Sequence, residues 1–188
     1  MKRFLFVAAT LFISLVIFAQ SGASSAAPET VEAKASVPRE FAGIQLGMAI
    51  EEVQKLLAGN GLFWYRGEAD VSLLPRPNET LIEVTGLSYI KRAFLQFHEG
   101  KLFIMIFAMN EKMIDHYTIF MNMQNKYGKF TSFSPSEIVW QDEVTRVSIE
   151  RPLAVKYIDL AIFNQLVLQG QELENYEKML MDDFLNQF

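Results

Sequence analysis

Residues that could carry acid–base, nucleophilic or metal chemistry are few and scattered. The chain has two histidines, His98 and His116, and no cysteine. Neither histidine stands in a metal-binding spacing such as His-Glu-x-x-His, and no Gly-x-Ser-x-Gly sequence marks a serine nucleophile. Asp159 lies between apolar neighbours, and a buried carboxylate there would need a cationic partner such as Arg146 or Lys156. These patterns favour a protein that is not an enzyme and that uses no cofactor or metal; an unrecognised hydrolase using Asp159 or His116 is the weaker interpretation.

Composition excludes several further classes. The chain has 188 residues, of which 51% are hydrophobic. This is enough apolar material for the hydrophobic core of one domain or of two small packed units, and the length excludes a large multidomain enzyme. A net charge of −5 argues against a nucleic-acid binder, because such proteins neutralise phosphates with lysine and arginine. The absence of cysteine excludes a disulfide framework.

The N-terminus has the pattern of an export signal. Positive charge at Lys2 and Arg3 precedes an uncharged apolar run from Phe4 to Ala19, which leads into small residues. The run is shorter than the roughly 20 residues of a membrane-spanning helix. We therefore predict a cleaved signal peptide at 1–19 and a periplasmic or otherwise extracytoplasmic protein. An uncleaved leader would be its only membrane anchor. The next segment, 20–40, is rich in Ala, Ser, Glu and Pro and predicts a flexible linker.

A first helix-plus-sheet unit is predicted at 41–110. Apolar residues at helical spacing predict a helix from Ile50 to Leu57 that ends at Gly59. A short aromatic strand at 62–65 and a long loop at 67–80 follow. Strands at 89–97 and 102–109 then form a hairpin closed at Glu99-Gly100. Because 102–109 is apolar at every position, we expect both of its faces to be covered.

The same order of elements recurs at 111–169. Helical spacing predicts a helix over 113–127, and strands are predicted at 138–140, 144–150 and 155–163. The fold class is therefore α+β, with two tandem helix-plus-antiparallel-sheet units packed into one body. An amphipathic C-terminal helix is predicted at 170–188, with its stripe at Leu173, Tyr176, Leu180, Phe184 and Phe188. It could dock into a partner, although folding back over the sheet is the commoner outcome for such a helix.

The start of the first unit resembles a known family. The segment Phe41-x-Gly43-Ile44-x-Leu46-Gly47-Met48, followed by Val53 and Leu57, resembles the opening of the BamE (SmpA/OmlA) outer-membrane-assembly proteins, whose fold is shared with the beta-lactamase inhibitor protein. This resemblance implies helices packed on a small antiparallel sheet, a cell-envelope location and function through protein binding. A tandem pair of such units is similar to the layout of the inhibitor protein.

Aromatic residues suggest where binding would occur. The chain has 16 Phe, 6 Tyr and 2 Trp, many of them in the predicted strands, and aromatic and arginine side chains are enriched at interface cores. The candidate binding surface consists of Trp64, Tyr65, Arg66, Arg92, Phe94, Phe103, Phe107, Trp140 and Arg146. Its expected partner is another envelope protein, and an ordinary core would explain the same rings. The alternative function is a small-molecule or lipid carrier whose strands line an apolar cavity.

Overall fold

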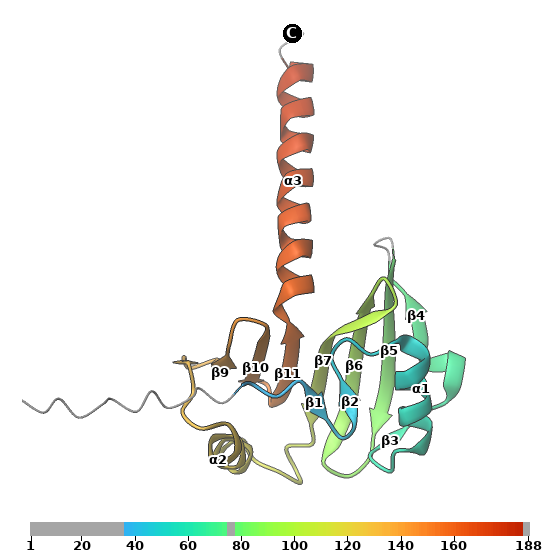
Figure 1. Ribbon diagram of the computed structural model, residues 1–188, viewed down its shortest axis with the longest axis vertical. Helices are drawn as coiled ribbons and strands as arrows, with labels where there is room; N and C mark the ends of the chain where they lie inside the picture. The colour runs from blue at the N-terminus through green and yellow to red at the C-terminus, as the bar shows by residue number, and fades with distance from the viewer. Residues whose placement is uncertain (1–35, 75–77, 186–188) are drawn as a thin grey trace, which may run out of the picture. The chain divides into compact units, whose positions relative to one another are not determined.

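The structure is a computed structural model that describes residues 36–74 and 78–185 (Figure 1). The predicted signal peptide at 1–19 and most of the predicted linker lie outside the described residues. Over these residues the fold is α+β, with three α-helices, a nine-stranded antiparallel sheet and a two-stranded sheet of β1 and β2. Within the described residues, no helix is both long and apolar enough to cross a membrane. The elements are β1 (Glu40–Phe41), β2 (Ile44–Gln45), α1 (Ile50–Gly59), β3 (Phe63–Trp64), the 3₁₀ helix η1 (Gly67–Asp70), β4 (Val71–Leu73), β5 (Glu79–Gly86), β6 (Ile90–His98), β7 (Lys101–Met109), α2 (His116–Tyr127), β8 (Ser132–Phe133), β9 (Glu137–Gln141), β10 (Thr145–Glu150), β11 (Ala154–Asp159) and α3 (Leu160–Leu185).

The sheet joins the two halves of the chain without a break. Its strand order is β3-β5-β6-β7-β11-β10-β9-β8, and β4 pairs with β5. The two halves meet where β7 pairs with β11, with Ile104 opposite Ile158 and Ala108 opposite Ala154. The β6–β7 hairpin is confirmed: Glu99 and Gly100 form its turn with φ of 49° and 74°. Glycine adopts such angles without the steric cost that a Cβ brings.

The main core lies on one face of the sheet, beneath α1 and α2. Val53 and Leu57 of α1 and Ile119 and Met123 of α2 belong to one hydrophobic cluster that also contains strand residues such as Met105. In α1, Glu52 accepts a hydrogen bond from the backbone N–H of Ala49 at 2.9 Å, which satisfies one of the free amides at the helix start. Because side chains alternate along each strand, the other face of the sheet carries a separate set of residues.

That second face has its own smaller cluster. Phe103 and Ile104 of β7 and Ile158 of β11 pack with Leu160 at the start of α3. Over residues 102–105 both faces of β7 are thus covered, because Leu102 and Met105 lie in the main core and Phe103 and Ile104 lie in the second cluster. Further along the strand, Ile106 and Ala108 are half-exposed. The expectation of a strand covered on both faces holds for the first half of β7 only.

Several predicted boundaries were wrong. The ordered fold begins before residue 41, because Val37 is buried in the main core and Glu40 is already in β1. The predicted loop at 67–80 contains η1, β4 and the start of β5. Residues 160–163 were predicted as strand and are helical, so the C-terminal helix begins ten residues before the predicted 170. The second helix begins at His116 and not at 113, because Asp115 caps it through the backbone N–H of Thr118.

Candidate binding surfaces

The nine predicted surface residues do not form one patch. Trp64, Tyr65 and Arg66 lie at the β3 edge of the sheet, where Trp64 is 61% exposed. Arg66 is engaged there with Asp70, which is buried: Nε and Nη2 of Arg66 lie 2.8 and 2.5 Å from Asp70 Oδ1. This ion pair is a local structural contact that joins the N-cap residue of η1 to its last residue, and the sequence analysis missed it.

Phe107 and Trp140 are core residues, which corrects their assignment to a surface. Their exposed fractions are 0% and 2%, and both belong to the main cluster under the helices. The Trp140 indole N–H donates to the carbonyl of Gly128 at 2.9 Å, so its polar group is also satisfied internally. The alternation of β7 and β9 places both rings on the helix-covered face.

Arg92, Phe94 and Arg146 lie on the opposite face of the sheet. Phe94 is half-exposed in a row that runs from Glu83 through Phe94 and Ile106 to Lys156. Both arginines are already paired on this face. Arg92 lies 2.6 Å from Glu83, and Arg146 lies 2.6 Å from Glu137. The Arg92 pair is exposed and the Arg146 pair is half-exposed. Ion pairs this open to water contribute little to stability, and these two keep the outer strands of this sheet face polar.

Phe103, the last of the nine, is also buried. It is 4% exposed, packs in the second cluster and makes an edge contact with the ring of His98 at a centroid distance of 6.3 Å. With Phe103, Phe107 and Trp140 buried, no continuous aromatic surface is left among the described strands.

Asp159 has a structural role, with a partner that the sequence analysis did not foresee. The expected cations were Arg146 and Lys156, and the actual partner is Arg39, which also donates to Thr145 Oγ1 at 2.9 Å. The other oxygen of Asp159 accepts from the backbone N–H groups of Ala161 and Ile162 and so caps α3. Lys156 pairs with Glu150 at 2.7 Å.

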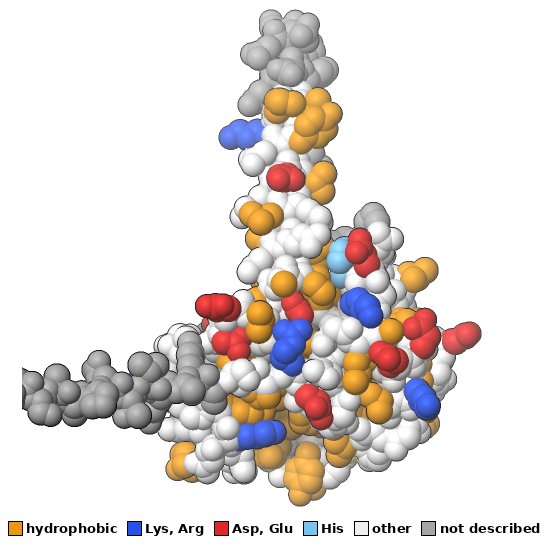
Figure 2. All heavy atoms as spheres, in the orientation of Figure 1, with side chains coloured by type: hydrophobic (Ala, Val, Ile, Leu, Met, Phe, Trp, Pro, Cys, Tyr) orange, Lys and Arg blue, Asp and Glu red, His pale blue; other side chains and the backbone are white. Residues whose placement is uncertain are grey.

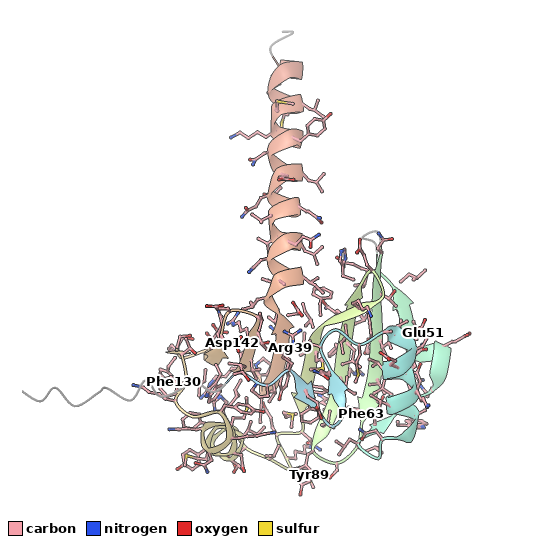
Figure 3. The ribbon with its side chains drawn as sticks, viewed as in Figure 1. Arg39, Glu51, Phe63, Tyr89, Phe130 and Asp142 are labelled. Carbon is pink, nitrogen blue, oxygen red and sulfur yellow. The ribbon has the colours of Figure 1, made fainter. Side chains whose placement is uncertain are left out.

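Asp142 holds the N-terminal segment beside this ion pair (Figure 3). Its carboxylate accepts from the backbone N–H of Val37 at 2.8 Å, and from those of Val144 and Thr145 at 2.9 and 2.8 Å. Burial alone would raise the pKa of Asp142, but these amides and the charge of Arg39 outweigh it, and the pKa falls below its ordinary value.

His116 is the remaining residue that the sequence suggested for catalysis. His116 begins α2, where burial lowers the pKa of the imidazole and the nearby charge of Arg151 lowers it further. No group of three or more metal-ligating side chains within the described residues could hold a metal ion.

The longest exposed apolar face belongs to α3. Ile162 and Leu166 pack on the second cluster of the sheet. At 100° per residue the same side of the helix continues through Leu173, Tyr176 and Leu180, which are 63%, 56% and 48% exposed. We call these three residues the α3 stripe; hydrophobic side chains, in orange, are visible along the described part of the helix (Figure 2). Three residues of the predicted helix face form this stripe, while Phe188 and the side chain of Phe184 lie outside the described residues. Of the helix that was expected to fold back over the sheet, Leu160, Ile162 and Leu166 at its base pack on the second cluster.

The spacing and charge of the stripe resemble one side of a coiled coil. Leu166, Leu173 and Leu180 are seven residues apart, and the second heptad position holds Ile162, Gln169 and Tyr176, so one polar residue interrupts the apolar row. Glu172 and Glu174, both exposed, lie on either side of the stripe by helical geometry. The arrangement can receive an apolar helix face and repel an acidic one.

In a comparison with protein families, the family model described as TP0088 domain matches residues 39–169. The search of curated proteins found no match, and neither did the search of solved structures. The matched range contains the whole sheet, α1, α2 and the sheet-packed base of α3. The α3 stripe lies beyond it.

Proposed function

The chain belongs to the TP0088 domain family, and we propose that it is an exported, non-catalytic binding or assembly module of the bacterial cell envelope that acts through contacts with another protein. The observation that carries this proposal is the α3 stripe. The helix face that packs on the sheet at Ile162 and Leu166 continues, exposed, through Leu173, Tyr176 and Leu180.

A partner helix would remove this apolar face from water. Exposed leucines scattered singly need no explanation, but an apolar row along one helix face is typical of an interaction site. On the other side of α3, Leu168 and Met179 are also exposed, but the polar Gln171 and Asn175 lie between them. The heptad spacing suits a second helix packed along the stripe with its side chains between those of α3. Tyr176 gives the stripe a residue type that is enriched among interface hot spots.

The charge of α3 selects the kind of partner. Between 170 and 188 the sequence has three Glu, two Asp and one Lys, a net charge of −4. A second copy of α3 would bring the same acidic residues to the contact, whereas a basic amphipathic helix would pair with them. We therefore infer a partner whose apolar helix face is flanked by lysine or arginine.

The envelope location is supported by the export pattern at 1–19 and by the resemblance of the segment from Phe41 to Met48 to the outer-membrane-assembly family. We further propose that the sheet derives from two tandem units, one with α1 and β3–β7 and the other with α2 and β8–β11. The order of the strands, with the two sets meeting only at β7 and β11, supports this division. Sequential pairing within each half is what two separately built units would give.

Two designed helical peptides test the partner chemistry. Both carry leucine at heptad positions a and d; one has lysine and the other glutamate at the flanking positions. We expect the lysine peptide to bind the protein, with an affinity that falls as salt rises because flanking ion pairs are screened. The glutamate peptide should not bind. Fluorescence anisotropy of labelled peptide measures both.

Matched variants locate the contact. Replacement of Leu173 and Leu180 by serine should weaken binding of the lysine peptide at least tenfold, since both lie in the stripe. The control pair Gln171→Ser and Asn175→Ser changes exposed residues on the opposite side of α3 and should leave binding unchanged. Equal binding of both peptides, or equal effects of the two variant pairs, would contradict the proposal.

A further inference from the structure

A cavity on the helix-covered face of the sheet is separate from the α3 stripe. It has a volume of about 540 Å³ and lies between α2, the segment 38–42 and the sheet where β7 meets β11. This volume is within the range of small-molecule sites in proteins. Its apolar walls are Phe41, Phe107, Ile119, Met123 and Val155.

Aromatic contacts form one wall of the cavity, and core residues of α2 form the other. Phe41 of β1 stacks on Phe107 with ring centroids 4.3 Å apart, and Phe107 makes an edge contact with Tyr157 at 6.2 Å. On the other side, Ile119 and Met123 anchor α2 in the main core. Methionine is flexible and polarizable, so the wall that Met123 contributes can adapt to a ligand.

A buried hydroxyl in the cavity lining is poorly satisfied. Tyr157 is 2% exposed, and its hydroxyl lies 3.4 Å from that of Tyr127. Hydroxyl–oxygen hydrogen bonds are typically about 2.7–2.8 Å long, so this contact is weak. Burial and the neighbouring Tyr127 raise the pKa of Tyr157 far above its ordinary value, and the phenol stays protonated. Tyr157 can therefore donate a hydrogen bond to a better acceptor than Tyr127.

The other polar residues that line the cavity mostly donate as well. Lys126 and Asn122 are exposed on α2, and they contribute an ammonium and an amide. Glu40 is the one carboxylate among the described lining residues. A ligand head group that accepts hydrogen bonds and carries negative charge fits a lining with two phenols, an amide and an ammonium.

From this geometry we propose that the cavity binds an amphiphile with a single apolar chain and a carboxylate head group. The chain contacts Phe41 and Ile114, which are half-exposed in the lining, and the flexible Met123, and the carboxylate accepts from Lys126 and from the tyrosine hydroxyls. This site goes beyond the proposed function, because it shares no residue with the α3 stripe.

Calorimetric titration with dodecanoate below its micelle concentration tests the site. We expect one dodecanoate to bind per chain. Asn122→Trp puts a large ring at the rim and should weaken binding at least tenfold, whereas Asn125→Trp, on an exposed α2 position outside the lining, should not. No binding, or an equal effect of the two variants, would overturn the proposal. Circular dichroism confirms that each variant is folded.

Head-group variants test the carboxylate. Lys126→Gln should weaken dodecanoate binding threefold to tenfold and leave dodecanol binding unchanged, while Lys129→Gln, an exposed control, should affect neither. Tyr157→Phe removes only the hydroxyl and should weaken dodecanoate binding by a similar factor, with Tyr117→Phe as the exposed control. Tighter binding of dodecanol than of dodecanoate, or no effect of Lys126→Gln, would exclude the carboxylate assignment.

Discussion

Two carboxylates tie the N-terminal segment to the second half of the sheet. Asp159 pairs with Arg39 and caps α3, while Asp142 accepts the backbone N–H of Val37. These contacts join residues more than 100 positions apart in the chain. They fix segment 37–41 across the seam between β7 and β11, where it forms one side of the cavity.

Arg39→Gln should destabilise the protein. Its side chain is 28% exposed and that of Asp159 only 11%, so the variant leaves a mostly buried carboxylate without its cation. We expect the free energy of unfolding to fall by about 2 kcal/mol. Urea denaturation followed by circular dichroism measures it, with Lys55→Gln on the exposed side of α1 as control. A loss no larger than that of the control would show that the pair is not stabilising.

Asp142→Asn should have a pH-dependent cost. The folded protein lowers the pKa of Asp142, so the ionised carboxylate contributes stability above about pH 4 and loses that contribution as the pH falls through the folded pKa. The difference in unfolding free energy between wild type and variant should therefore be larger at pH 7 than at pH 3. Glu143→Gln, an exposed neighbour, should show no such trend. A penalty for Asp142→Asn that is the same at both pH values would contradict the assignment.

For Asp159, the sequence correctly indicated the kind of contact, an ion pair, but not the residue that forms it. The apolar surroundings of Asp159 correctly indicated a buried carboxylate that needs a cation. Its partner could not be found, because Arg39 stands in a segment whose composition predicts a linker, and only the tertiary fold brings the two together. The same holds for the aromatic residues, since their number does not reveal which face of a strand each one occupies.

At the scale of elements, the β5–β6 connection contains a position that only glycine fits. A Cβ on Gly86 would lie 2.4 Å from the backbone oxygen of Ile90, whereas one on Gly61 would meet no heavy atom within 4 Å. Gly86→Ala should therefore cost about 1–3 kcal/mol of stability through overpacking. Gly61→Ala should change stability by less than about 0.5 kcal/mol. Urea midpoints for both variants check this, and similar midpoints would refute it.

The two parts of α3 should respond differently to the same substitution. Leu166→Asp puts a charge into the cluster at the base of α3 and should reduce the unfolding free energy by about 2 kcal/mol. Leu173→Asp, seven residues later on the same side of the helix, changes an exposed residue and should cost less than about 0.5 kcal/mol. Denaturation of the two variants compares them directly. Equal losses would mean that the stripe is part of the folded core.

Elements with local signals were predicted well. The spacing of Val53 and Leu57 and the turn at Glu99-Gly100 located α1 and the β6–β7 hairpin, since short-range contacts determine both. The start of α3 was missed because Leu160 to Phe163 is apolar at every position, a pattern that fits a buried strand as well as a helix. No glycine or proline separates β11 from α3, and Asp159, as the helix cap, was the one available signal.

At the scale of the whole molecule, one sheet with two different faces organises the described chain. The face under α1 and α2 carries the main core and the cavity, and the other face carries ion pairs and the cluster that anchors α3. A rigid sheet would hold the base of α3 while its stripe is presented to a partner. The family match covers the part that builds this support, and the proposed contact lies beyond it.

The most direct test of the protein-binding proposal is site-specific photo-crosslinking in the cells that make the protein. A photoreactive amino acid at Leu173 should give an adduct with a different protein, one whose linked segment is a basic amphipathic helix. The same amino acid at Asn175, on the other side of α3, should give none. Adducts only with a second copy of the chain, or equal adducts from both positions, would contradict the proposal.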